Sequence, residues 1–220
     1  SWANWLVLLK AMFALPLSAS ERPVFCRLTQ RTRPPARLVR EAWFVIGRRG
    51  GKTFIAALIA VYCCVCRTYT LAAGEVGTFI LIAADRKQAR GLKRYISGLL
   101  HAAGVLQAFI AKETQQAIVL TNGLVIEIHT ASFRSIRGYT VIGAICDELA
   151  FWPTDESTNP DSEILAALRP AMATVVDAVL VCITTPNAKR GEAWKAYREH
   201  YGHDDDTRLV AVAETRILVG

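Results

Sequence analysis

The sequence predicts an α/β protein with a mainly parallel central sheet and helices on both faces. Two observations lead to this fold class: uninterrupted apolar runs of strand length, and longer segments with helical patterns between them. A strand that is buried on both faces has no polar alternation, and such strands are typical of parallel sheets covered by helices. With 220 residues, 52% of them hydrophobic, the chain can form a full core, and a disordered chain is excluded.

The first expected helix lies within residues 6–17, an apolar run that ends near Pro16. The run resembles the apolar core of a signal peptide followed by small residues at 18–20, but Lys10 interrupts it. It is also too short to span a bilayer. We therefore expect an amphipathic or buried helix here, and we expect no membrane as a partner.

The next segments alternate between strand and helix patterns. The run AWFVIG predicts a strand over residues 42–47, and the apolar stretch 52–67 is long enough for a helix. The run TFILIAA predicts a buried strand over residues 78–84. Asp85 can cap the helix that follows over residues 86–103, where basic side chains recur at helical spacing.

The second half of the chain begins with a predicted hairpin. Residues 117–120 and 124–131 are expected strands, and the sequence Thr-Asn-Gly between them is a hairpin signal. Strands and helices then alternate again. The remaining expected strands are residues 141–146, 178–185 and 208–213, and the remaining expected helices are residues 161–176 and 191–201.

Basic residues are concentrated in one segment. The chain has a formal net charge of +7, and residues 22–52 contain nine basic side chains and one acidic one. A basic segment favours a polyanionic partner such as nucleic acid or a membrane surface, and it does not choose between them.

Residues 47–53, with the sequence GRRGGKT, lie between a predicted strand and a predicted helix, which is the placement of a phosphate-binding loop. The glycines let backbone N–H groups surround a phosphate, Lys52 can reach the β and γ oxygens, and the Thr53 hydroxyl can bind Mg²⁺. The template GxxxxGK[ST] fails at its first position, where Ile46 stands. The alternative is a glycine turn with a chance Lys-Thr, but the strand–turn–helix placement favours a phosphate loop.

Two acidic residues follow the predicted strand 141–146. Asp147 is placed to hold a metal ion, and Glu148 is placed to polarise an attacking water molecule. The alternative is a pair of acids that cap a helix. Because both half-motifs end predicted strands in the expected order, and ligands of open α/β sheets bind at that edge, the pattern predicts a P-loop NTPase of the ASCE type.

The strand 178–185 ends in two hydroxyl residues, Thr184 and Thr185. Side chains at this edge of the sheet can sense a γ-phosphate, and the alternative is a plain strand-to-turn boundary. Arginines also lie near the expected site, in the loop itself and before the acidic strand at Arg134 and Arg137. A guanidinium can stabilise the charge that develops in phosphoryl transfer, whereas the alternative for each is a solvated charge or a DNA-phosphate contact.

Together these residues resemble the ATPase domain of the large terminase subunit, the DNA-packaging motor of tailed bacteriophages and related viruses. The Walker A motif of that family has the form [GS]-R-Q-x-G-K-[ST], which residues 47–53 match except that Arg49 replaces Gln. Asp147-Glu148 match its acidic strand end, Thr184-Thr185-Pro186 its coupling motif, and Arg137-Gly138 its Arg-Gly. The resemblance spans about residues 5–220.

The resemblance implies ATP and Mg²⁺ as cofactors and a role for each matching residue. The implied catalytic residues are Glu148 as base, Arg48 as an arginine acting in cis and Arg137 as a finger acting in a neighbouring subunit. The implied metal ligands are Thr53 and Asp147, and the implied coupling residues are Thr184 and Thr185. The implied nucleotide-binding residues are Gly47, Arg49, Gly50, Gly51, Lys52, Thr53 and an adenine-reading Gln30.

The function that the resemblance implies is Mg²⁺-dependent ATP hydrolysis that drives double-stranded DNA into a viral procapsid. The implied partners are DNA, further copies in a ring on the portal, and the small terminase subunit, in the cytoplasm of the infected host cell. Residues 1–40 are expected to form an N-terminal helix and a basic adenine-side segment, and residues 41–220 an ATPase core. The family's C-terminal nuclease domain, and with it nuclease activity, is not expected in this chain.

Two other functions remain open at this point. One is a superfamily 2 helicase-like DNA-dependent ATPase, which should show a longer DEAD/DEAH-type box and a second RecA-like domain. The other is a scaffold that binds a nucleotide without hydrolysing it, and Glu148 argues against it, because a pure binder needs no positioned base.

Overall fold

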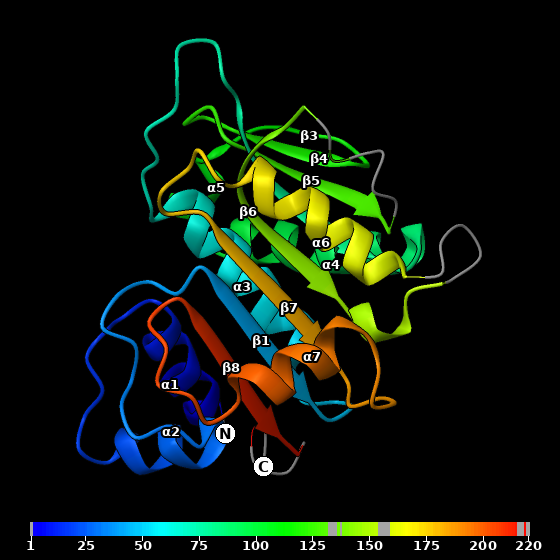
Figure 1. Ribbon diagram of the computed structural model, residues 1–220. Coiled ribbons are helices and arrows are strands. Elements are labelled where there is room, and N and C mark those ends of the chain that lie inside the picture. The colour runs from blue at the N-terminus through cyan, green and yellow to red at the C-terminus, as the bar shows by residue number, and fades with distance from the viewer. Residues whose placement is uncertain (1, 132–135, 137, 154–158, 215–217, 219–220) are drawn as a thin grey trace.

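The computed structural model of the protein describes residues 2–131, 136, 138–153, 159–214 and 218 (Figure 1). Within these residues, no helix combines the length and the apolar character that crossing a membrane requires. The described N-terminal residues share one hydrophobic core with the rest of the chain, because Trp5 and Leu8 are fully buried in it.

The centre of the fold is an eight-stranded sheet with the order β3-β4-β5-β2-β6-β7-β1-β8 in the described chain. The strands from β5 to β8 in this order run parallel, whereas β3 and β4 form an antiparallel edge. The strands are β1 (Glu41–Ile46), β2 (Gly77–Ala83), β3 (Ile110–Glu113), β4 (Ala117–Leu120), β5 (Val125–Thr130), β6 (Thr140–Asp147), β7 (Val179–Thr184) and β8 (Arg208–Ala213).

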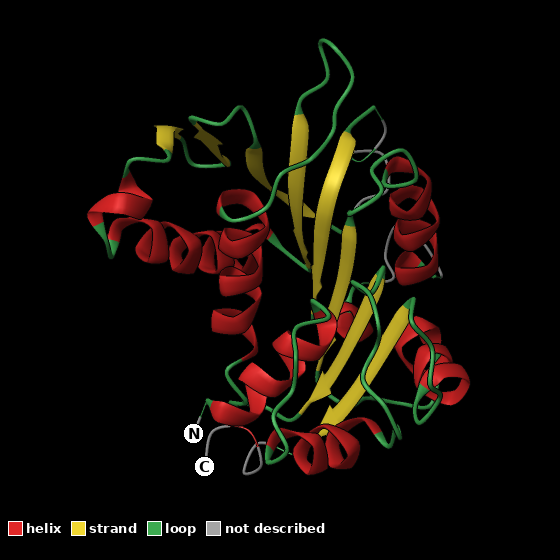
Figure 2. Ribbon diagram, turned by 90° about the vertical axis from the view of Figure 1, so that its left-hand side faces the viewer, coloured by secondary structure: helices red, strands yellow, loops and turns green. Residues whose placement is uncertain are grey.

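Helices cover both faces of this sheet (Figure 2). Helices α3 and α4 lie on one face, and α6 and α7 lie on the other (Figure 1). The helical elements are α1 (Ala3–Met12), α2 (Glu21–Thr29), α3 (Lys52–Val65), α4 (Arg86–His101), α5 (Gly104–Gln107), η2 (Leu149–Phe151), α6 (Pro160–Ala171) and α7 (Gly191–His200). The predicted α/β class, with a mainly parallel sheet between two helical layers, is confirmed.

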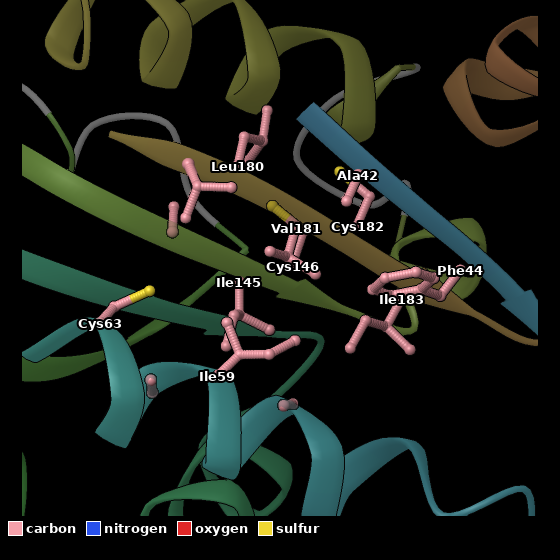
Figure 3. Packing of buried hydrophobic residues seen from close by; sticks show 14 of the residues in the cluster. Ala42, Phe44, Ile59, Cys63, Ile145, Cys146, Leu180, Val181, Cys182 and Ile183 are labelled. Atoms are coloured by element: carbon pink, nitrogen blue, oxygen red, sulfur yellow. The ribbon is translucent and has the colours of Figure 1, made fainter. Parts of the chain in front are cut away.

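The core lies between the sheet and its helices. Every residue of β2 and of β7 is buried, which explains why these strands are continuous apolar runs. On one face, Ile59 and Cys63 of α3 pack toward Ile145 of β6 (Figure 3). Gly143 of β6 is required by close approach, because a Cβ there would lie 2.5 Å from the ring of Phe79. The strands near the site therefore stand on a densely packed base.

Several predicted boundaries were wrong for local reasons. Helix α1 runs from Ala3 to Met12 and ends well before Pro16, because Ala14 turns left-handed at φ 55° and the Leu15 N–H donates to the Lys10 carbonyl. Helix α6 ends at Ala171 rather than near residue 176. Pro170 in its last turn has no N–H to donate, and the Ala173 N–H bonds the Pro170 carbonyl in a tight turn instead of continuing the helix.

Four of the described elements were missed altogether: α2, β3 and the two short helical turns α5 and η2. Helix α2 has basic residues and a proline in its first turn, so it shows little apolar periodicity. Strand β3 is short and mostly exposed, and its structure depends on antiparallel pairing with β4. Neither pattern differs enough from a loop in sequence.

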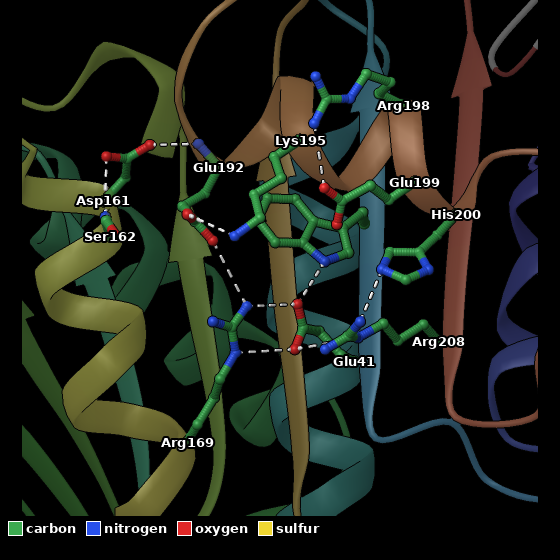
Figure 4. Close-up of polar contacts among 11 residues, drawn as sticks. Glu41, Asp161, Ser162, Arg169, Glu192, Lys195, Arg198, Glu199, His200 and Arg208 are labelled. Atoms are coloured by element: carbon green, nitrogen blue, oxygen red, sulfur yellow. Dashed lines mark hydrogen bonds and ion pairs between the residues drawn. The ribbon is translucent and has the colours of Figure 1, made fainter.

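A network of ions supports the amino-terminal edge of the sheet (Figure 4). Glu41, at the start of β1, is 7% exposed and accepts two hydrogen bonds from Arg169 at 3.0 and 3.2 Å. The Trp43 indole also donates to Glu41 at 2.7 Å, and Arg208 of β8 lies 3.9 Å away. This carboxylate thereby links β1, β8 and α6.

We expect Glu41→Gln to lower the free energy of unfolding by about 2 kcal/mol, because it removes the charge that faces a partly buried arginine. Urea unfolding followed by circular dichroism measures the change. The matched control is Glu199→Gln, which breaks an exposed ion pair with Arg198 in the same view and should change stability by less than about 0.5 kcal/mol. Equal effects of the two substitutions would contradict a structural role for Glu41.

Candidate functional site

The predicted site residues meet at the carboxyl-terminal edge of three neighbouring strands. In the sheet, β7 lies between β6 and β1, and all three are parallel. The register pairs Asp147 with Ile183 and Thr184 with Val45, so the ends of the strands are level. The topology therefore brings together the glycine-rich loop, the acidic pair and the threonine pair, as the sequence predicted for parallel strands.

The glycine-rich loop between β1 and α3 has the backbone of an anion nest. Arg49 and Gly51 are left-handed, with φ of 61° and 77°, and the Gly50 N–H donates to the Gly47 carbonyl at 3.3 Å. A Cβ on Gly50 would lie 2.6 Å from the Ile46 side chain, so this position requires glycine. The first amides of α3 have no carbonyl partner inside the helix and point toward the loop. The loop can therefore hold a phosphate.

Lys52, the first residue of α3, is 7% exposed and surrounded by oxygen atoms. Its Nζ donates to the carbonyls of Ile46 and Gly47 at 3.1 and 3.2 Å and to Thr185 Oγ1 at 2.9 Å. It also lies 3.2 Å from Glu148 Oε1. A buried ammonium needs such partners, and each of these oxygens can be replaced by a phosphate oxygen.

Glu148 is held in a strained position beside this lysine. Its backbone is left-handed, with φ 49°, and its N–H donates to the Ile183 carbonyl at 2.7 Å. Its carboxylate accepts the Thr185 N–H at 2.7 Å and the Thr185 hydroxyl at 2.9 Å, and the Thr184 hydroxyl lies 3.5 Å away. Left-handed conformations of non-glycine residues are costly and concentrate at functional sites.

The Thr185 hydroxyl joins the other two groups. It accepts a hydrogen bond from Lys52 and donates one to Glu148, so its proton has one defined direction. The three side chains come from α3, the end of β6 and the end of β7. A change at any one of them is therefore transmitted directly to the other two.

Asp147 is the least exposed carboxylate of the described edge, at 8%. Burial and the neighbouring Glu148 raise its pKa to about 6, and the attraction of Lys52 only partly opposes them. Its backbone carbonyl accepts the Trp152 indole N–H at 3.0 Å, which ties the strand end to the following turn. A nearby cation would therefore stabilise the ionised form of the Asp147 carboxylate.

The residues at this edge fit Mg²⁺. The ion prefers oxygen ligands, keeps several waters and uses only one or two carboxylates when phosphates complete its shell. Asp147 and the Thr53 hydroxyl, in the first turn of α3, offer such donors. Within the described residues no group of three or more His, Cys, Asp or Glu residues could hold a metal ion.

The structure describes two of the four arginines that the sequence places near the site. Arg48 and Arg49 both expose their side chains at the phosphate loop. Arg137, the predicted finger, and Arg134 lie outside the described residues. The catalytic roles of Arg48 and Arg137 stay predictions.

Gln30 is placed away from the other predicted residues. It ends α2, and its amide donates to the Arg27 carbonyl at 3.1 Å. The next residue, Arg31, donates to the Asp205 carbonyl at 2.7 Å, just before β8 begins. This is the amino-terminal edge of the sheet, roughly 17 Å from the carboxyl end of a six-residue strand such as β8. Its adenine-reading role stays a prediction.

Two features of the site were not foreseen in the sequence. Trp5 of α1 donates its indole N–H to the Gly50 carbonyl of the phosphate loop at 2.7 Å. A cavity of about 280 Å³ also lies beside Thr185, between the loop after β7 and the aromatic side chains Trp194 and Tyr197 of α7. The spacing of these aromatics along one helix face is visible in the sequence, whereas nothing local connects Trp5 with Gly50.

Residues 43–202 match the family model described as terminase large subunit, T4likevirus-type, N-terminal. The matched segment contains the phosphate loop, the acidic pair and the threonine pair. No curated protein matches the chain.

Solved structures of phage terminases share the fold. The ATPase domain of the Thermus phage P74-26 large terminase has a TM-score of 0.61 and 15% identity, over 96% of this chain and 86% of that one. The HK97 bacteriophage large terminase has a TM-score of 0.63 and 14% identity, over 96% and 44%. The large terminase of a thermophilic bacteriophage in complex with ADP has a TM-score of 0.59 and 13% identity, over 82% and 42%.

This chain spans less than half the length of the HK97 protein and of the ADP-bound terminase, and at these identities the likeness shows the fold alone. The family match covers well over half of the chain and includes the residues of the site. The protein therefore belongs to the large terminase subunits of the T4likevirus type and contains their N-terminal region, folded as a P-loop NTPase.

Proposed function

We propose that this chain is a Mg²⁺-dependent ATPase that drives double-stranded DNA into a viral procapsid. The observation that carries the proposal is the network of Lys52, Glu148 and Thr185 beside a loop shaped for phosphate. Such a network contains a cation for the phosphates, a carboxylate for the water and a hydroxyl that contacts both. The thermophilic phage terminase solved in complex with ADP supports the binding of a nucleotide by this chain.

Nucleotide binding begins with the phosphate loop and Lys52. The amides of the loop and of the first turn of α3 bind the phosphate oxygens, which the helix dipole also favours. Lys52 exchanges its contact with Glu148 for the β and γ oxygens. In this exchange Lys52 binds the phosphates, and the Glu148 carboxylate is released from Lys52 only when the nucleotide is bound.

Thr53 and Asp147 hold the metal ion in this proposal. Mg²⁺, when bound there, supplies positive charge to the oxygens of the transferred phosphoryl group. Because the pKa of Asp147 is raised to about 6, this carboxylate is ionised at neutral pH and protonated in mild acid. Its protonation and metal binding therefore compete.

Glu148 acts as the general base. After Lys52 has turned to the phosphates, the carboxylate keeps its hydrogen bonds from the Thr185 N–H and hydroxyl, which fix its orientation. In this position it accepts a proton from the water that attacks the γ-phosphorus. Thr184 ends β7 and Thr185 follows it, so loss of the γ-phosphate reaches the segment that leads to α7.

The remaining roles are proposed by analogy with the family. Arg48 in cis, and Arg137 of a neighbouring copy in trans, would stabilise the transition-state charge. We infer a ring of copies on the portal, with the small terminase subunit and DNA as partners, in the cytoplasm of the infected cell. The basic segment, residues 22–52, supports a polyanionic substrate.

We expect Lys52→Ala to abolish ATP hydrolysis, because it removes the cation that faces the phosphates. A phosphate-release assay measures turnover, and titration calorimetry measures binding of ATP. The control is Lys195→Ala on α7, whose side chain is 58% exposed and whose loss should leave both unchanged. Turnover retained by the Lys52 variant would contradict the phosphate-loop assignment.

We expect Glu148→Gln to lower kcat by at least about 100-fold while the affinity for ATP changes by less than about threefold. The amide keeps the size of the side chain and cannot accept the proton of the attacking water. Single-turnover hydrolysis in the presence of DNA, beside an equilibrium binding curve, separates these two effects. An unchanged kcat would refute the role of base.

We expect Asp147→Asn to stabilise the metal-free protein, and more at pH 8 than at pH 5. The pKa of Asp147 is raised on folding, so the folded state prefers the protonated form, and ionisation lowers stability as the pH rises through about 6. Asparagine does not ionise, so the variant does not lose this stability as the pH rises. Urea unfolding at the two pH values, with EDTA present, tests it, and a gain that is equal at both would contradict the assignment.

A further inference from the structure

The N-terminal helix contacts the phosphate loop through one side chain. Trp5 is fully buried, and its indole N–H donates to the Gly50 carbonyl at 2.7 Å across 45 residues of sequence. Its ring meets the ring of Phe44 on β1 edge to face, with centroids 5.5 Å apart and planes at 82°. The tryptophan is therefore fixed by the strand and aimed at the loop that follows it.

The carbonyl that Trp5 binds belongs to the most easily turned peptide of the loop. Gly50 and Gly51 are adjacent glycines, and glycine adopts positive and negative φ with similar ease. A peptide between two glycines can rotate without a side-chain clash, so its orientation needs an external contact. Among the described contacts, the Trp5 indole provides this for the Gly50 carbonyl.

The orientation of this carbonyl also determines the direction of an amide. In a trans peptide the C=O of one residue and the N–H of the next point in opposite directions. With the Gly50 carbonyl turned toward Trp5, the Gly51 N–H is turned to the opposite side of the peptide. Gly51 is the N-cap of α3, where an unpaired N–H belongs to the anion-binding end of the helix.

We propose that Trp5 is a positioning residue of the phosphate loop, whose indole N–H holds the Gly50–Gly51 peptide so that the Gly51 N–H faces a bound phosphate. The inference rests on the proposed nucleotide site. It assigns a function to α1 at the phosphate loop. The contact preorganises the loop, because the Gly51 N–H already points toward the phosphate position before the phosphate binds.

The chain offers a matched control. Trp43 is as buried as Trp5, at 1% exposure, and its indole N–H also makes a 2.7 Å hydrogen bond. Its acceptor is Glu41, at the opposite end of β1 from the loop. Trp43→Phe thus removes the same atoms and a buried indole hydrogen bond from the core, here one to a carboxylate, without touching the phosphate loop.

The test is binding of pyrophosphate and of ADP with Mg²⁺, measured by titration calorimetry on wild type, Trp5→Phe and Trp43→Phe. We expect Trp5→Phe to weaken both ligands by about tenfold, the upper range for loss of one net hydrogen bond. Trp43→Phe should lower the urea midpoint yet change both dissociation constants by less than about twofold. In ATP hydrolysis, Trp5→Phe should raise KM and leave kcat within about threefold.

A second variant isolates the N–H itself. Placing 3-benzothienylalanine at position 5 keeps the shape of the ring and replaces the N–H with sulfur, so it serves if Trp5→Phe folds poorly. We expect the same loss of pyrophosphate affinity, and in spectra of ¹⁵N-glycine-labelled protein a smaller shift of the Gly51 amide on adding pyrophosphate. Unchanged affinity in this variant would overturn the proposal.

Two other outcomes would also overturn it in distinguishable ways. Equal weakening by Trp5→Phe and Trp43→Phe would show that Trp5 acts only through general stability. A wild-type chain that binds neither pyrophosphate nor ADP would refute the proposed nucleotide site, and the role of Trp5 with it. Binding by the wild type together with unchanged binding by the Trp5 variants would refute only the inference.

Discussion

The position of β7 between β6 and β1 is the constraint on which the site depends. Because these strands are parallel and level, their carboxyl ends place Lys52, Glu148 and Thr185 within hydrogen-bonding distance. None of these residues is close to the other two in sequence. The ammonium of Lys52 then joins the phosphate loop to both strand ends, and the site becomes one connected unit.

Packing in the surrounding structure offsets the unfavourable free energy of the buried charges and strained backbone at this edge. The edge holds a buried ammonium, a buried carboxylate whose pKa is raised, and two non-glycine residues in left-handed conformations, Arg49 and Glu148. Such features persist only where packing determines them strongly. Here fully buried strands lie beneath the edge, and at the opposite edge the Glu41 network secures β1 to its neighbours.

The sequence predicted the fold and the meeting of three segments at one sheet edge, because both depend on local patterns. Apolar runs identify buried strands, and the order of strands and helices places their ends at one edge. Helix α2 and strand β3 were not predicted because their sequence patterns are weak. The end of α1 depends on the left-handed backbone of Ala14, which the residue preferences of alanine do not indicate. Gln30 fits a loose pattern before the first core strand, yet it lies at the amino-terminal edge of the sheet.

By itself, the sequence determined the α/β class and the position of the glycine-rich loop and of the acidic strand end, since each is encoded in contiguous residues of defined spacing. Only the tertiary structure decided which groups meet. Thr185 joins Lys52 to Glu148 through strand order and register, and Trp5 reaches Gly50 through the packing of α1 on Phe44. These contacts connect residues 37 to 133 positions apart at the edge and 45 apart at the loop, and such distances leave no local signal.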